Sequence, residues 1–177
     1  MQPTRSESVL AACAAGKWVL CSSFIEESAD AGAFVHEPEH EFIHDKESPF
    51  KSISMKRLAG APRRWRTQLE SGPAGTGAFT GWDVLLCVSE SKREGFRRLL
   101  VAGGANVVSL NVPYPNGISA THVFVEADTQ TGGDAAKAVA SAPHGVKILK
   151  ADYIAEYLSS SASAAEGHAA ELKFAFQ

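Results

Sequence analysis

The chain has 177 residues, 45% of them hydrophobic, which suits one domain or two small ones with a real core. Its formal net charge of −3 gives no overall attraction to nucleic acid or to an anionic membrane. No stretch approaches the roughly 18 apolar residues of a membrane span, and the N-terminus lacks a signal pattern, so neither membrane insertion nor secretion is expected. The three cysteines form no CxxC pair and are expected to be buried free thiols.

The first 32 residues predict a helix, a strand and a second helix. Ser6–Ala15 has helical character, Ser6 can cap it, and Gly16 can end it in the left-handed conformation. Lys17–Cys21 is largely apolar and predicts a strand. Ser23–Ala31 then predicts a helix that ends at the next glycine.

Residues 33–80 have the composition of a linker. Four prolines interrupt this stretch, and an acidic part is followed by a basic one, which is typical of a solvated segment. One helix is predicted inside it, with Pro62 in the first turn and Gly72 at the end. Trp65 and Leu69 would share one face of that helix and could anchor it to a domain.

Residues 81–159 predict a wound α/β unit. The apolar run Gly81–Val88 is typical of a strand buried on both faces of a parallel sheet. A polar turn over Ser89–Glu94 and a helix over Gly95–Val101 should follow it, and Asn106–Leu110 and His122–Val125 predict two more strands. The order strand, helix, strand, strand, helix, strand, helix predicts an α/β fold with a small parallel sheet flanked by helices.

Two stretches of the chain resemble each other. Gly16–Ile25 aligns without gaps on Gly145–Ile154, and each has a glycine, an apolar strand, and a helix that begins with an aromatic-isoleucine pair. We therefore expect a complete repeat over residues 81–159, preceded by a C-terminal half repeat over residues 1–32, with residues 160–177 as a flexible tail. The half repeat would leave an open strand edge, so fast amide exchange is expected at Val19 and Leu20.

The residues of both copies resemble BRCT domains. The marks are a Gly-Gly pair before a strand in Gly103–Val108, the strand Thr121–Val125, and the glycine-led strand Ala15–Leu20 followed by an aromatic-containing helix. Leu10–Trp18 and Pro62–Arg66 resemble, more closely, the N-terminal tandem BRCT regions of the ankyrin-repeat factors that localise an SMC-type DNA-repair complex.

This resemblance implies a nuclear, non-catalytic adaptor of the DNA damage response that needs no cofactor. Such an adaptor would bind a phosphorylated repair protein, expected to be an E3 ubiquitin ligase of post-replication repair, and help recruit the SMC-type complex to damaged chromatin. The alternative is a phosphate-independent scaffold or dimerisation module. An enzyme of the receiver or nucleotide-binding type is a weaker option, because the acidic cluster or phosphate loop that it requires is missing.

The resemblance also implies where a phosphate would bind: a serine or threonine at the end of the first strand, and a lysine at the start of a later helix. Phosphoserine carries close to two negative charges and needs several fixed donors. In the first copy that strand is absent and Ser8 takes the position of the lysine, with Arg5 nearby. In the second copy Ser89 and Lys137 are the candidate pair; the alternative is a capping serine and a solvated lysine.

Position in the repeat also suggests a groove between the two copies. Leu10, Ala151 and Ala155 would line it, and side chains of a partner could insert there. Ordinary packing of three helices is the alternative, since small and apolar helix faces are usually core. In either case the helix that carries Leu10 is expected to dock on the Phe96 helix and the Ile154 helix of the complete repeat.

Two further patterns carry less weight. His36, His40 and His44 follow one another at four-residue spacing and could bind zinc on a helix, but Pro38 lies among them and no metal site is expected. Basic residues within Lys51–Arg66 could contact DNA. The negative net charge favours an exposed linker instead, so DNA binding is not expected.

Overall fold

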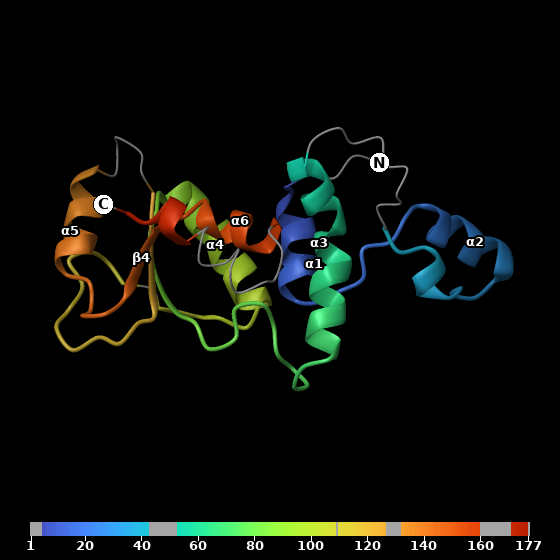
Figure 1. The fold of residues 1–177 in the computed structure, drawn as a ribbon, viewed down its shortest axis with the longest axis horizontal. Helices are drawn as coiled ribbons and strands as arrows, with labels where there is room; N and C mark the ends of the chain where they lie inside the picture. The colour runs from blue at the N-terminus through green and yellow to red at the C-terminus, as the bar shows by residue number, and fades with distance from the viewer. Residues whose placement is uncertain (1–4, 43–52, 109, 127–131, 160–170, 177) are drawn as a thin grey trace.

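The structure is a computed structural model that describes residues 5–42, 53–108, 110–126, 132–159 and 171–176. Figure 1 shows the arrangement of its elements. Among the residues in these ranges, no helix is both long and apolar enough to cross a membrane. In chain order they are α1 (Glu7–Ala14), α2 (Ser23–Ala31), the 3-10 helix η1 (Glu37–Glu39), α3 (Ile53–Glu70), β1 (Asp83–Cys87), α4 (Glu90–Ala102), β2 (Asn106–Val108), β3 (His122–Val125), α5 (Gly132–Ala140), β4 (Lys147–Lys150) and α6 (Tyr153–Ser159).

The four strands form one parallel sheet in the order β2-β1-β3-β4. Its register is set by the pairing of Leu85 with Val108 and Val123, and of Val123 with Ile148. Leu85 and Val123 are fully buried, as expected for a parallel sheet with both faces covered. The order of strands and helices from β1 to α6 is the predicted one, and the α/β fold class is confirmed.

Helices cover both faces of the sheet (Figure 1). On one face α4 and α6 pack together with α1, and the core there includes Leu100, Phe124 and Ile154. On the other face α5 and the loop after β2 enclose Val125 and Ala138. Two hydrophobic cores thus lie on either side of a single central sheet.

The first helix, α1, matches its prediction and its expected docking. The Ser6 hydroxyl accepts a hydrogen bond from the Val9 N–H at 3.4 Å, and Gly16 follows the helix at φ 61°. Leu10 and Cys13 are buried in the core that α1 shares with α4 and α6. The N-terminal residues are therefore part of the main core of the described structure.

The three cysteines are free, as expected. Cys13 and Cys87 are buried, whereas Cys21 is only half-buried. Burial raises the pKa of the Cys13 thiol to about 12, so this thiol stays protonated and unreactive near neutral pH.

Helix α4 begins earlier than predicted. Residues from Glu90 onward are helical, so the expected turn at Ser89–Glu94 is wrong beyond its first residue. An acidic residue in the first turn suits the helix dipole, and Arg97 pairs with Glu94 at 2.8 Å one turn away along the exposed face. These local charges stabilise the first turn of the helix, which the polar sequence alone suggested was a loop.

Helix α3 is longer than predicted and packs against the domain. It begins at Ile53, so Pro62 lies in its interior and not in its first turn. A proline there removes one backbone hydrogen bond, but the Pro62 ring is fully buried and its packing offsets that loss. Trp65 is 3% exposed and donates from Nε1 to the Leu158 carbonyl at 2.9 Å, while Leu69 packs on the same core. The predicted anchoring face is therefore correct.

The strand predicted at Lys17–Cys21 does not form a ladder. Leu20 makes an isolated antiparallel bridge to Glu41, in which the Phe42 N–H donates to the Val19 carbonyl at 2.7 Å. A strand needs a hydrogen-bonded neighbour along its whole length, and among the described residues this segment pairs with another at a single bridge only. The strand prediction is therefore wrong here, whereas α2 has its predicted bounds.

The described part of the C-terminus lies along β4. Residues 171–174 are helical, Ala175 forms an isolated antiparallel bridge with Leu149, and the Phe176 N–H donates to the Ile148 carbonyl at 3.0 Å. The expectation of a flexible tail is wrong for these residues, because they hydrogen-bond to the sheet. Residues 160–170 and 177 lie outside the described part of the chain.

Candidate peptide-binding groove

A groove of about 430 Å³ lies between α1, α4 and α6. The apolar part of its lining consists of Leu10, Phe96, Leu99 and Ala155. Leu10 and Leu99 are buried, whereas Phe96 and Ala155 are half-buried and remain accessible. We call this feature the α1/α4/α6 groove; it exists only because α1 packs on the α/β unit.

Ion pairs line the rim of the α1/α4/α6 groove. Arg5 pairs with Glu156 at 2.9 Å, and Arg98 pairs with Glu7 at 2.8 Å. The hydrogen bond from Arg98 lowers the pKa of Glu7, so this carboxylate is ionised at neutral pH. The groove thus has an apolar floor and a rim whose positive and negative charges are balanced.

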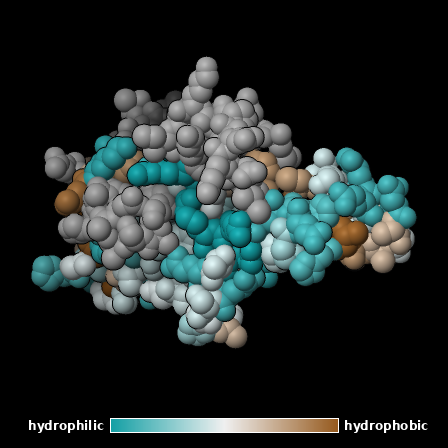
Figure 2. Space-filling view, turned by 45° about the vertical axis from the view of Figure 1, so that its right-hand side comes forward, coloured by the Kyte–Doolittle hydropathy of each residue, from teal (hydrophilic) through white to brown (hydrophobic). Residues whose placement is uncertain are grey.

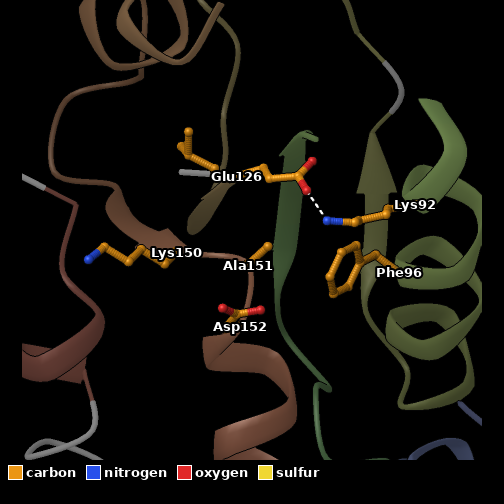
Figure 3. Close-up of a pocket in the computed structure, with 7 residues that line it drawn as sticks. Lys92, Phe96, Glu126, Lys150, Ala151 and Asp152 are labelled. Atoms are coloured by element: carbon orange, nitrogen blue, oxygen red, sulfur yellow. Dashed lines mark hydrogen bonds and ion pairs between the residues drawn. The ribbon is translucent and has the colours of Figure 1, made fainter. Parts of the chain in front are cut away.

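A second cavity, of about 420 Å³, lies at the ends of β3 and β4 (Figure 3). It shares Lys92, Phe96 and Asp152 with the α1/α4/α6 groove, so the two adjoin. The Glu126 carboxylate accepts hydrogen bonds from the Lys92 ammonium and from the Ser89 N–H, the latter at 2.9 Å. Both bonds lower the pKa of Glu126, with the Lys92 bond the larger cause.

A third, smaller cavity of about 210 Å³ lies at the end of β1, between α4 and α5. Arg93 and Asp134 both line it, so its charges are mixed. Ser89 and Lys137 flank this region but line none of the three cavities. A phosphate in this cavity would lie near the Asp134 carboxylate, which opposes its binding.

The predicted phosphate residues are scattered. Ser89 is the N-cap residue of α4, and its hydroxyl lies 3.4 Å from that of Ser91. Lys137 is exposed on α5 and pairs with Asp134 at 3.1 Å. Arg5 lies on the groove rim, and Ser8 is exposed in the first turn of α1. Their role in phosphate binding stays a prediction.

The predicted groove residues are partly brought together. Leu10 and Ala155 line the α1/α4/α6 groove from opposite helices, whereas Ala151 lines the adjoining cavity at the strand ends. Sequence reasoning did not assign Lys92 or Phe96 to the groove. Their four-residue spacing places them on one face of α4, but the sequence predicted that helix only from Gly95, so Lys92 fell in the expected turn.

His40, one of the three histidines weighed as zinc ligands, is buried. Its Nδ1 lies 3.1 Å from the Ser23 hydroxyl and its Nε2 lies 3.6 Å from Glu27. Within the described residues there is no group of three or more His, Cys, Asp or Glu that could hold a metal ion. His44 lies outside the described part of the chain.

Comparison with known proteins identifies the class. Residues 76–169, more than half of the chain, match the family model described as TopBP1/SLF1, BRCT domain. The chain therefore belongs to the TopBP1/SLF1 type of BRCT domain. The solved structure of the BRCT5-BRCT6 domains of S. pombe Brc1 has the same fold, with a TM-score of 0.60 at 16% identity, over 90% of this chain and 76% of that one.

Particular relatives are more similar in sequence. The chain is 42% identical over 121 residues to SMC5-SMC6 complex localization factor protein 1 of Mus musculus, and 41% identical over 121 residues to that of Homo sapiens. Each alignment covers 68% of this chain but 11% of the relative, so the chain spans about a ninth of their length. A BRCT domain-containing protein of Arabidopsis thaliana is 23% identical over 93% of this chain and 12% of that protein.

Proposed function

We propose that this chain is a nuclear, non-catalytic adaptor of the DNA damage response. It binds a phosphorylated repair protein, such as an E3 ubiquitin ligase of post-replication repair, and helps bring an SMC-type complex to damaged chromatin. Homology to the SMC5-SMC6 complex localization factor supports the link to that complex. We infer the binding role from the α1/α4/α6 groove.

The groove has the character of a peptide site. An extended peptide could insert one apolar side chain between Leu10 and Phe96 while its polar flanks meet the charged rim. Burial of the peptide's apolar surface contributes about 25 cal/mol per Å², from which the cost of ordering the peptide is subtracted. The charges of the rim fix the orientation of the bound peptide. No other chemistry is needed, because binding alone performs the role of an adaptor.

Recognition of a phosphate at this site would require a basic residue of the groove to contact it. Arg5, Lys92 and Arg98 are the basic residues of the groove lining, and each already pairs with a carboxylate. A phosphoserine carries more charge than a carboxylate, so it could replace a glutamate as the partner of Arg5. Such an exchange gains less than a contact with an unpaired cation, and we expect phosphorylation to raise affinity modestly.

The test compares one peptide of the repair ligase in phosphorylated and unphosphorylated forms, titrated by fluorescence anisotropy against the full chain. Ala155→Arg fills the groove and should weaken binding at least about tenfold, or about 1.4 kcal/mol. Ala102→Arg, exposed at the C-terminal end of α4, is the matched control and should bind as the wild type does. If Ala155→Arg binds the peptide as tightly as the wild type does, the groove is not the binding site.

Single variants then separate the candidate phosphate contacts. Arg5→Ala should reduce the preference for the phosphorylated peptide if the phosphate binds at the rim, and Lys137→Ala should do so if it binds beside α5. The balanced ion pairs of the rim favour the second candidate function, a phosphate-independent scaffold. Equal affinity for both peptides, still lost in Ala155→Arg, would establish that alternative.

A further inference from the structure

The α1/α4/α6 groove and the cavity at the ends of β3 and β4 meet at three residues. Lys92, Phe96 and Asp152 line both, whereas Leu10 and Ala155 line only the groove. The cavity has a volume of about 420 Å³. A peptide that places an apolar side chain in the groove therefore has room for a second side chain in the adjoining cavity.

The charged residues of the groove lining are paired, with one exception. Ion pairs engage Arg5, Glu7, Lys92, Glu94 and Arg98. Asp152 belongs to the same lining and is exposed, but within the described part of the chain its carboxylate has neither an ion pair nor a side-chain hydrogen bond. The uncompensated charge of the groove lining is therefore negative.

Lys150, near Asp152 in the chain, also lacks an ion pair among the described residues. It lines the cavity at the strand ends but not the groove. Figure 3 shows its side chain extending away from Phe96 and Asp152. Lys150 therefore leaves the Asp152 carboxylate uncompensated at the place where the groove and the cavity meet.

The Phe96 ring is a second reason to expect a cation at this place. The ring is half-buried and borders both the groove and the cavity. The face of an aromatic ring attracts a cation, and a planar guanidinium can stack on a ring while it donates two hydrogen bonds to a carboxylate. The ammonium of lysine is a compact and strongly hydrated charge, so arginine fits this pair of side chains better.

The separation of the two positions sets the spacing in the peptide. Asp152 directly precedes α6, and Ala155 lies three residues further on, which corresponds to about 4.5 Å along the helix axis. An extended peptide advances about 3.3 Å per residue, and its side chains two residues apart point to the same side. An arginine two residues from the apolar anchor is therefore able to reach Asp152.

Given the proposed binding of a peptide in this groove, we propose that the peptide carries an arginine two residues from its apolar anchor. The guanidinium binds the Asp152 carboxylate and stacks on Phe96 in the adjoining cavity. Without a ligand, Asp152 has only the structural role of a negative charge near the start of a helix. With one, it makes the groove specific for a basic residue.

Short synthetic peptides test this assignment without knowledge of the natural partner. Acetyl-Leu-Gly-Arg-amide and acetyl-Arg-Gly-Leu-amide cover the two chain directions, and the same peptides with citrulline keep the shape of arginine but lack its charge. Each is titrated against the full chain by ¹H–¹⁵N NMR. In at least one direction the arginine peptide should bind about fivefold more tightly than its citrulline form, the contribution of an exposed ion pair and a cation–π contact, and should shift the amide signals of Phe96 and Asp152.

Asp152→Asn separates charge from fold, because asparagine is also favoured at the start of a helix. This variant should bind the arginine and citrulline peptides equally, with the affinity for the citrulline peptide unchanged. Asp30→Asn is the matched control and should keep the preference for arginine. Asp30 is an exposed aspartate of α2, which extends away from α1, α4 and α6 in Figure 1, and Figure 2 shows a largely hydrophilic surface on that extension.

Three results would overturn the assignment of Asp152: equal affinity of the arginine and citrulline peptides for the wild type, a preference that persists in Asp152→Asn, or no binding by any of the peptides. Tighter binding of acetyl-Leu-Gly-Glu-amide would also overturn it and would point to Lys150 instead. Failure of the proposed function is distinguishable. Loss of the citrulline peptide in Ala155→Arg supports the groove whether or not arginine is preferred, and the repair-ligase peptide tests the groove independently.

Discussion

The buried ion pair between Glu41 and Arg66 supports a sharp stability prediction. The side chain of Glu41 is 2% exposed and accepts two hydrogen bonds from Arg66, from Nε and Nη2, both at 2.9 Å. These bonds, with the one that Arg66 donates to Glu70, raise the pKa of Arg66. Arg66 also lies 3.6 Å above the ring centroid of Trp18. The pair therefore attaches residues 17–42 to α3.

Removal of one partner from a buried pair costs about 3–5 kcal/mol, because the other charge stays buried without compensation. Glu41→Ala leaves Arg66 with Glu70, at 2.7 Å, so we expect the lower end, about 3 kcal/mol of unfolding free energy. Glu70→Ala is the control: its side chain is 55% exposed, and the loss should stay below about 1 kcal/mol. The double variant Glu41→Leu/Arg66→Met should recover most of the loss, since it leaves no unpaired charge.

Urea unfolding followed by circular dichroism gives these free energies. Hydrogen exchange shows whether Glu41→Ala frees residues 17–42 before the rest of the chain unfolds. If Glu41→Ala and Glu70→Ala have equal effects, the pair does not attach this unit and the reasoning from burial fails.

Two further predictions concern a buried histidine and a close backbone contact. Burial lowers the pKa of His122 to about 4, so the unfolded chain, with a pKa near 6.5, binds more protons between these values. Stability is therefore full above pH 6.5 and falls by about 2 kcal/mol between pH 7 and 5, a slope that His122→Phe should remove in urea titrations. At Gly103, a Cβ would lie 2.4 Å from Cδ2 of Phe79, so Gly103→Ala should cost about 1–3 kcal/mol. Gly133→Ala, where a Cβ meets open space, should stabilise α5 slightly, by up to about 1 kcal/mol; equal thermal melting shifts for the two glycine variants would contradict the contact.

The core of the fold could be read from the sequence because its signals are local. An uninterrupted apolar run such as Val84–Val88 can only be satisfied by burial on both faces, and the strands that follow repeat the pattern. Ser6 and Gly16 mark the ends of α1 through their own backbone and side-chain chemistry. The aligned Gly16 and Gly145 both adopt positive φ, so the repeat is visible in the backbone as well.

Other features depended on contacts between distant residues. Lys17–Cys21 has the composition of a strand, but a strand needs a partner edge, and only an isolated bridge forms. Pro62 is tolerated inside α3 because its ring and Trp65 are buried, which local propensity does not record. Lys92 meets Glu126 across 34 positions of the chain, and no spacing rule predicts that contact.

By itself, the sequence determined the order of helices and buried strands from β1 to α6, because periodicity and capping act over a few residues. The tertiary structure alone decided which side chains meet: it joined Leu10 to Ala155 in one groove and placed Ser89 and Lys137 outside it. The physical reason is that a site is a set of distances between elements, and those distances follow from the packing of whole helices on the sheet.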